Sequence, residues 1–122
     1  MVGVIFFGHG SPIESANEAV REVARAAARH GGWELWEAAF LEGGKPDLEG
    51  AVAALRNHGA RRIVIVPYFL TLGLHLQRDL PRIVRELTAV HPDIEIICGA
   101  PLDGHPALAT ILAERAQEAI KP

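Results

Sequence analysis

Two histidines and a glutamate are the residues of this 122-residue chain best suited to chemistry. His9 lies within a Gly-His-Gly sequence directly after an apolar run, Glu42 precedes a pair of glycines, and His75 follows a second apolar run. Neutral imidazole and carboxylate groups bind divalent transition metals, and an incomplete set of protein ligands leaves positions for a substrate. Imidazole also exchanges protons near neutral pH. If folding brings the three side chains together, they can bind a metal ion, move protons, or do both.

The strand expected to position His75 is the unbroken β-branched run of residues 63–66. Such a run favours a strand that is covered on both faces of a parallel sheet. Pro67 cannot donate a hydrogen bond to a sheet, so the strand should end there and open into a loop. Asp79 is expected to cap the next helix, with Pro81 in its first turn. The sequence therefore predicts that His75 lies in a loop beyond the carboxyl end of a buried strand.

The rest of the chain alternates strand and helix patterns in the same way. Ser11 and Glu14 have the S-x-x-E spacing of a capping box at the start of the first helix. Glu34 and Glu37 interrupt the second strand, which indicates an edge position in the sheet. The last helix, beginning near Pro106, is expected to turn its apolar stripe toward the core. That stripe consists of Leu108, Ile111, Leu112 and Ala116, and the expected strands span residues 2–7, 33–40, 63–66 and 94–98.

Repeated strand–helix units with apolar strands predict an α/β fold, namely a four-stranded parallel sheet with helices on both faces. We expect the flavodoxin-like strand order 2-1-3-4 in a single domain that spans residues 1–122. In this order the first and third strands are neighbours, and their connections leave toward opposite faces where such sheets bind ligands. His9 and His75 would then lie over one crevice, and Glu42 would approach it from the side.

The composition restricts the class of protein. Hydrophobic residues make up 49% of the chain and charged residues 22%, as in an ordinary globular domain, and the formal net charge of −3 disfavours a nucleic-acid partner. The single cysteine, Cys98, excludes an internal disulfide and a cysteine-based zinc cluster, fits a reducing cytoplasm, and is expected to be buried. No apolar run approaches the roughly 20 residues that span a bilayer, so no membrane segment is expected.

Four segments together resemble the small single-domain sirohydrochlorin chelatases, which are class II tetrapyrrole chelatases. They occur in the expected order over nearly the whole chain, and the third is the most specific. The segments are Gly8-His9-Gly10-Ser11; Phe40-Leu41-Glu42 followed by Pro46; Pro67-Tyr68-Phe69-Leu70 with Gly73, His75, Asp79 and Pro81; and Pro101-Leu102-x-Gly104-His105-Pro106.

The resemblance implies ATP-independent insertion of a divalent metal into sirohydrochlorin, with cobalt as first choice and iron or nickel as alternatives. The metal would be a substrate, no cofactor would be permanently bound, and the product would serve cobalamin or sirohaem biosynthesis. By the same resemblance, His9 and His75 handle the metal and accept protons, and Glu42 is the acidic group of the site. Longer relatives carry two such domains, so the resemblance also implies a homodimer.

The tetrapyrrole needs cationic or N–H partners for its carboxylates and an apolar wall for its ring. Arg78, Arg82 and Lys45 have the right charge, and Ser11 opens a helix whose first amides can receive a carboxylate. Tyr68, Phe69, Leu72 and Leu74 provide apolar surface. We therefore expect Ser11, Tyr68, Leu74 and Arg78 to contact the tetrapyrrole, with Lys45 at the rim.

Other classes of function remain open from the sequence. A phosphatase or mutase that uses a phosphorylated histidine also places a His-Gly pair after the first strand, but it needs an arginine beside that histidine, where this chain has Gly8. A non-catalytic metal or tetrapyrrole carrier would keep the same ligands without turnover. A nucleotide-binding module is disfavoured, because neither G-x-x-x-x-G-K-[ST] nor G-x-G-x-x-G occurs.

Overall fold

Strands and helices alternate along residues 1–121, the part of the chain that the computed structural model describes. The strands form one parallel sheet in the order β2-β1-β3-β4, which confirms the predicted α/β fold and its flavodoxin-like strand order. The elements are β1 (Val2–Gly8), α1 (Glu14–Gly31), β2 (Leu35–Phe40), α2 (Leu48–Asn57), β3 (Arg62–Pro67), α3 (Gly73–Val90), β4 (Glu95–Cys98) and α4 (Ala107–Ile120).

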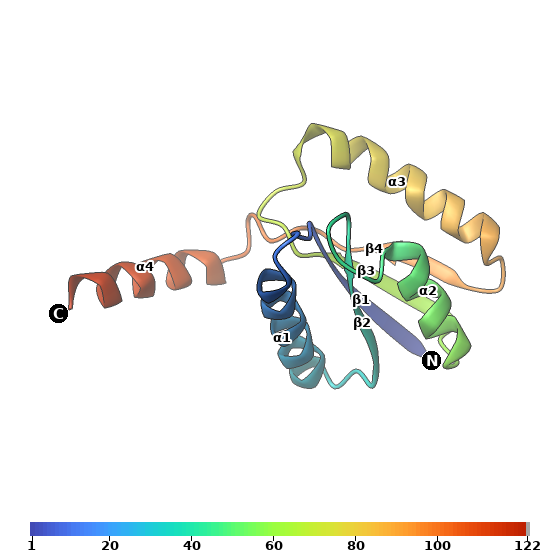
Figure 1. The fold of residues 1–122 in the computed structure, drawn as a ribbon, viewed down its shortest axis with the longest axis horizontal. Helices are drawn as coiled ribbons and strands as arrows, with labels where there is room; N and C mark the ends of the chain where they lie inside the picture. Colours follow the sequence, from blue (N-terminus) through green and yellow to red (C-terminus); the bar gives the residue numbers. More distant parts are fainter. Residues whose placement is uncertain (122) are drawn as a thin grey trace.

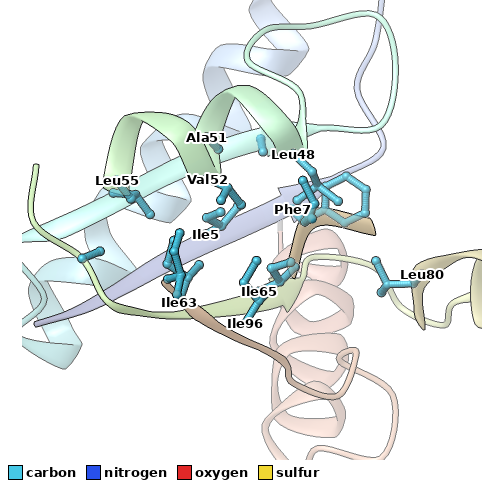
Figure 2. Close-up of a cluster of buried hydrophobic side chains, with 14 of the residues drawn as sticks. Ile5, Phe7, Leu48, Ala51, Val52, Leu55, Ile63, Ile65, Leu80 and Ile96 are labelled. Atoms are coloured by element: carbon cyan, nitrogen blue, oxygen red, sulfur yellow. The ribbon is translucent and has the colours of Figure 1, made fainter. Parts of the chain in front are cut away.

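Helices lie on both faces of the sheet, with α1 on one face and α2 and α3 on the other (Figure 1). Ile5 and Phe7 of β1 point toward α2 and α3, whereas Val4 and Phe6 point toward α1, as the two-residue period of a strand requires. Figure 2 shows the larger of the two cores, where Ile5 and Phe7 meet side chains of α2, β3 and α3. Each fully buried large apolar side chain contributes about 1.5–3 kcal/mol to folding. The double-sided burial explains why β1 reads as a continuous apolar run.

The strand register sets the edge of the sheet at which the functional loops begin. Gly8 of β1 pairs with Phe40 of β2, and Phe7 pairs with Pro67 of β3. Three neighbouring strands thus end at the same level. The loops that carry His9 and Glu42, and the segment that leads to His75, all leave from this carboxyl edge.

Two predicted helix starts are wrong. α1 begins at Glu14 without a side-chain cap, because the hydroxyl of Ser11 accepts the backbone N–H of Ile13 (3.0 Å) in a local turn and forms no capping box. α3 begins at Gly73, so His75 lies in the first turn of a helix and not in a loop, and Pro81 lies inside that helix. Burial of Leu76 and Leu80, one turn apart, offsets the backbone hydrogen bond that the proline cannot donate.

The last helix also departs from prediction, since α4 projects away from the rest of the chain (Figure 1). No residue of α4 is buried, and Ile111 and Leu112 of its apolar stripe are 48% and 70% exposed. The expectation that Leu108, Ile111, Leu112 and Ala116 face the core is therefore wrong; only Leu108 is half-buried. A periodic apolar stripe shows that a helix has a face to cover, but not which surface covers it.

The departure of α4 leaves part of the sheet without a helix. On the α1 side of β3 and β4, Val64 and Val66 are only half-buried and Ile97 is 37% exposed. Cys98, at the end of the edge strand β4, is exposed, contrary to the prediction that it is buried.

Within residues 1–121, no helix combines the length and apolar character required to cross a membrane.

Candidate metal-binding site

His9 and Glu42 face one another across two neighbouring loops. Backbone hydrogen bonds continue the pairing of β1 and β2 beyond the strands, from the N–H of Leu41 to the oxygen of Gly8 (2.9 Å) and from the N–H of Glu42 to the oxygen of His9 (3.0 Å). The two side chains meet with Nε2 of His9 3.0 Å from Oε1 of Glu42, and they are 61% and 69% exposed. The pair is therefore preformed and open to solvent.

The contact between His9 and Glu42 has the dimensions of a pair of metal ligands. A carboxylate only accepts hydrogen bonds, so Nε2 of His9 donates to Glu42 when no metal is bound. Histidine nitrogen and carboxylate oxygen each bind a transition metal at about 2.0–2.2 Å, which places neighbouring ligand atoms about 3 Å apart. A divalent metal can thus take the place of the shared proton without a large movement of either side chain.

Two glycines allow the loops to come this close. Gly10 has a φ of +91°, and a Cβ there would lie 1.6 Å from the backbone oxygen of Glu42. Gly43 has a φ of +70°, and a Cβ there would lie 2.8 Å from the carbonyl carbon of Ser11. Both positions combine a left-handed backbone with direct backbone contact, which only glycine permits. The Gly-His-Gly and Glu-Gly-Gly sequences thus reflect the packing of one loop against the other.

A buried asparagine, which the sequence analysis did not identify, joins the same loops. Asn17 of α1 is 1% exposed, and its Oδ1 accepts the backbone N–H of Ser11 (2.9 Å). Its Nδ2 donates to the backbone oxygens of Ser11 (2.8 Å) and Gly43 (3.0 Å). The available signal was a polar residue within the apolar stripe of the first helix, between Ile13 and Val20.

Arg21 of α1 reinforces this connection from the surface. Its guanidinium contacts Glu14 (2.6 Å) and donates to the backbone oxygen of Lys45 (3.3 Å), and it lies over the ring of Phe40 at 5.2 Å. The hydrogen bond from Arg21 is the main reason that the pKa of Glu14 is below its usual value, with a further contribution from Asn17. Helix α1 therefore holds the β2–α2 loop through one buried and one half-buried polar side chain.

His75 occupies a separate position in the first turn of α3. Nη2 of Arg78 lies 3.1 Å from Nδ1 of His75, and because a guanidinium only donates, the Nδ1 atom accepts. The neutral ring then carries its proton on Nε2. Leu74, which is 84% exposed, and Gln77 line one hollow together with these two residues.

The structure thus brings together two of the three predicted ligands. Within residues 1–121, no three His, Cys, Asp or Glu side chains form a group that could hold a metal ion. His9 and Glu42 are in contact, whereas His75 is hydrogen-bonded to Arg78. Any site that uses all three must be completed by a ligand or by movement of exposed side chains.

The residues expected to contact a tetrapyrrole are distributed around this edge of the sheet. Phe69 is in edge contact with His9, with ring centres 6.4 Å apart, and Tyr68 is 38% exposed beside it. Ser11 is held through its backbone by Asn17. Lys45 lines a hollow with Glu42, and Arg78 lines the hollow of His75. Cationic groups thus flank both functional segments, and an aromatic wall lies next to His9.

The sequence matches the family model for CbiX over residues 3–119. The chain belongs to the CbiX family. A relative from Methanopyrus kandleri, named sirohydrochlorin cobaltochelatase, is 31% identical over an alignment of 140 positions that covers 98% of each chain. This match confirms the resemblance seen in the four sequence segments.

Solved structures agree with the fold of this CbiX-family chain. A putative cobalamin (vitamin B12) biosynthesis CbiX protein from Marinobacter aquaeolei VT8 superposes with a TM-score of 0.87 at 25% identity, covering 99% of this chain and 98% of the other. SirB from Bacillus subtilis, solved with Fe³⁺, gives a TM-score of 0.88 at 23% identity. The match covers 99% of this chain but 48% of SirB, so the chain corresponds in fold to about half of that protein.

Proposed function

We propose that this chain inserts a divalent metal into sirohydrochlorin, with cobalt as first choice and iron or nickel as alternatives. The observation that carries the proposal is the solvent-open His9–Glu42 pair at the carboxyl edge of the sheet in a CbiX-family chain. The relative from Methanopyrus kandleri is named for cobalt insertion into this tetrapyrrole. The metal is a substrate of the reaction, which uses neither ATP nor a permanently bound cofactor. The product would enter cobalamin or sirohaem biosynthesis in the cytoplasm, where the lone Cys98 would remain reduced.

Metal capture begins at His9 and Glu42. Both side chains are more than half exposed, so a hydrated ion can exchange its water ligands one at a time for imidazole nitrogen and carboxylate oxygen. The proton on Nε2 of His9 leaves to solvent as the ion takes its place. The remaining coordination positions of the metal then face the tetrapyrrole.

Proton removal is assigned to His75. Insertion of the metal displaces the N–H protons of the ring, and a nearby base must accept them. Nδ1 of His75 is basic but is engaged by Arg78 (3.1 Å). When a carboxylate of the tetrapyrrole binds Arg78, Nδ1 is released and can accept a ring proton. Arg78 thereby links substrate binding to the availability of the base.

The ring is proposed to lie against Phe69, Tyr68 and Leu74. The edge contact between Phe69 and His9 supports this position, because it places aromatic surface directly beside the metal ligand. Lys45 offers a second cation near Glu42. The hydroxyl of Ser11, which accepts a hydrogen bond from Ile13, can in turn donate to a substrate carboxylate.

The partner is proposed to be a second copy of the chain. Two observations support a homodimer: α4 has no buried residue, and the α1 side of β3 and β4 lacks a covering helix. The match to about half of SirB is consistent with an assembly of two such units. We propose that α4 of each subunit covers this face of the other subunit.

The function is tested by anaerobic metal insertion, followed by the absorbance of sirohydrochlorin with Co²⁺, Fe²⁺ or Ni²⁺. The wild-type chain should accelerate insertion over several turnovers, and His9→Ala and His75→Ala should each lower the rate by about a hundredfold or more. His30→Ala, an exposed histidine at the end of α1, is the matched control and should retain the wild-type rate. Binding of metal or tetrapyrrole without turnover would contradict the enzyme and favour the carrier alternative.

A further inference from the structure

Asn17 is the one polar or charged side chain among residues 1–121 that is buried, at 1% exposure. Its amide has one oxygen that accepts and two N–H groups that donate, and all three are used. The oxygen accepts the N–H of Ser11, and the donors reach the backbone oxygens of Ser11 and Gly43. A third acceptor, the carboxylate of Glu14, lies at 3.5 Å, the limit of hydrogen bonding.

These bonds connect the two segments that carry the paired site residues. Ser11 follows His9 by two residues, and Gly43 follows Glu42 directly. The same helical side chain therefore holds both loops, and it does so from inside the protein, whereas the site itself is exposed. Backbone hydrogen bonds from Leu41 to Gly8 and from Glu42 to His9 also join these segments, and Asn17 adds a buried side chain that bonds to both.

We propose that Asn17 is a positioning residue that holds the His9 and Glu42 loops at the spacing of two metal ligands. This inference rests on the proposed function for its consequence in metal binding, but the positioning itself is a property of the two loops. An amide is suited to the role because each loop offers a backbone oxygen that needs a donor, while Ser11 also offers an N–H that needs an acceptor. Aspartate cannot donate to Gly43, and alanine satisfies neither loop.

A purely structural role for Asn17 makes a different prediction. If the hydrogen bonds only stabilise the fold, their loss should lower global stability without a specific effect on the pair. If they position the pair, their loss should weaken metal binding only while both His9 and Glu42 are present as ligands. A double-mutant cycle separates the two roles.

The first measurement is amide hydrogen exchange on the whole chain for Asn17→Asp and Asn17→Ala, compared with Ile63→Val. Ile63 is fully buried at the opposite end of the sheet and serves as the control for lost stability. We expect the amides of Leu41 and Glu42, which donate across the loops, to exchange about tenfold faster in the Asn17 variants but not in the control. Equal exchange in all variants would overturn the proposal. Asn17→Ala provides the result if the buried aspartate prevents folding.

The second measurement is the affinity for Co²⁺ alone, determined by calorimetry. Asn17→Ala should weaken binding about tenfold in the wild-type background and have little further effect in the Glu42→Gln background. Equal losses in both backgrounds, or no loss in either, would overturn the positioning role. A wild-type chain that binds Co²⁺ but does not insert it would refute the chelatase and leave this cycle valid. Amide exchange needs no metal, so it decides the positioning of the loops even if Co²⁺ does not bind.

Discussion

The two site histidines make their hydrogen bonds through different ring atoms and in opposite directions. His9 donates from Nε2 to Glu42, whereas His75 accepts at Nδ1 from Arg78. His9 can therefore become a metal ligand by exchanging one proton for the ion, and His75 can become a base only after Arg78 moves. The difference follows from the partners, because a carboxylate only accepts hydrogen bonds and a guanidinium only donates them. The proposed division of labour between metal capture and proton removal rests on this asymmetry.

Glu37 of β2 permits a prediction about pH. Partial burial raises the pKa of Glu37, with a smaller opposing effect from His58. A raised pKa means that the folded state holds this proton more tightly than the unfolded state. The stabilisation is fully present below the unfolded pKa and is lost as the pH rises through the folded pKa.

We therefore expect Glu37→Gln to raise the free energy of unfolding at pH 7 and to have little effect near pH 4. Urea unfolding of wild type and variant at the two pH values measures the difference. Glu34→Gln, at an exposed position just before β2, controls for the removal of one negative charge. The same gain at both pH values would show that burial of the charge is not the cause.

At the scale of elements, the sequence predicted the strands better than the helix positions. Uninterrupted apolar runs and glycine-containing breaks were sufficient to predict strand order 2-1-3-4 and to place His9 and Glu42 at one edge. The first turn of α3 was missed, because Asp79 and Pro81 look like a helix start although burial of Leu76 extends the helix to Gly73. Asn17 was missed because the partners of a buried amide are backbone atoms far away in sequence, which leave no motif.

The contact between the two site loops makes Gly10 and Gly59 a useful pair of positions. Both have a left-handed backbone, with φ of +91° and +104°, but a Cβ at Gly59 would meet nothing within 4 Å. Gly59→Ala should cost about 1–2 kcal/mol from the backbone conformation alone. Gly10→Ala should cost about 1–3 kcal/mol more, because its Cβ would force the Glu42 loop away.

Chemical denaturation of the two glycine variants measures this difference, and Co²⁺ titration measures its effect on the site. Only Gly10→Ala is expected to lose metal affinity, since Gly59 lies at the end of α2 far from the functional loops in sequence. Similar stability for the two variants would mean that the loops separate easily. The backbone contact would then not be what holds His9 near Glu42.

At the scale of the whole molecule, one helix and part of one sheet face, the α1 side of β3 and β4, each lack a partner. Leu108, Ile111 and Leu112 lie on one side of α4, while Val23 of α1 and Leu70 border an apolar hollow at the base of that helix. The 14 residues of α4 extend about 21 Å, long enough to cross a sheet of this size. Because α4 points away from its own sheet, a second copy can accept it while offering its own α4 in return (Figure 1). Such a reciprocal arrangement closes as a two-fold dimer.

Light scattering of the full chain should therefore give about twice the 13.2 kDa mass of one chain. Leu112→Glu places a charge on the apolar side of α4 and should yield monomers, whereas Gln117→Glu adds the same charge on the opposite side and should leave the dimer intact.

To identify the occupant of the uncovered face, chains carrying only Val23→Cys can be mixed with chains carrying only Leu112→Cys, both with Cys98→Ser. A disulfide between the two kinds of chain is the expected result. A monomeric wild type, with a disulfide forming only when both cysteines are in one chain, would mean that α4 folds back onto its own sheet.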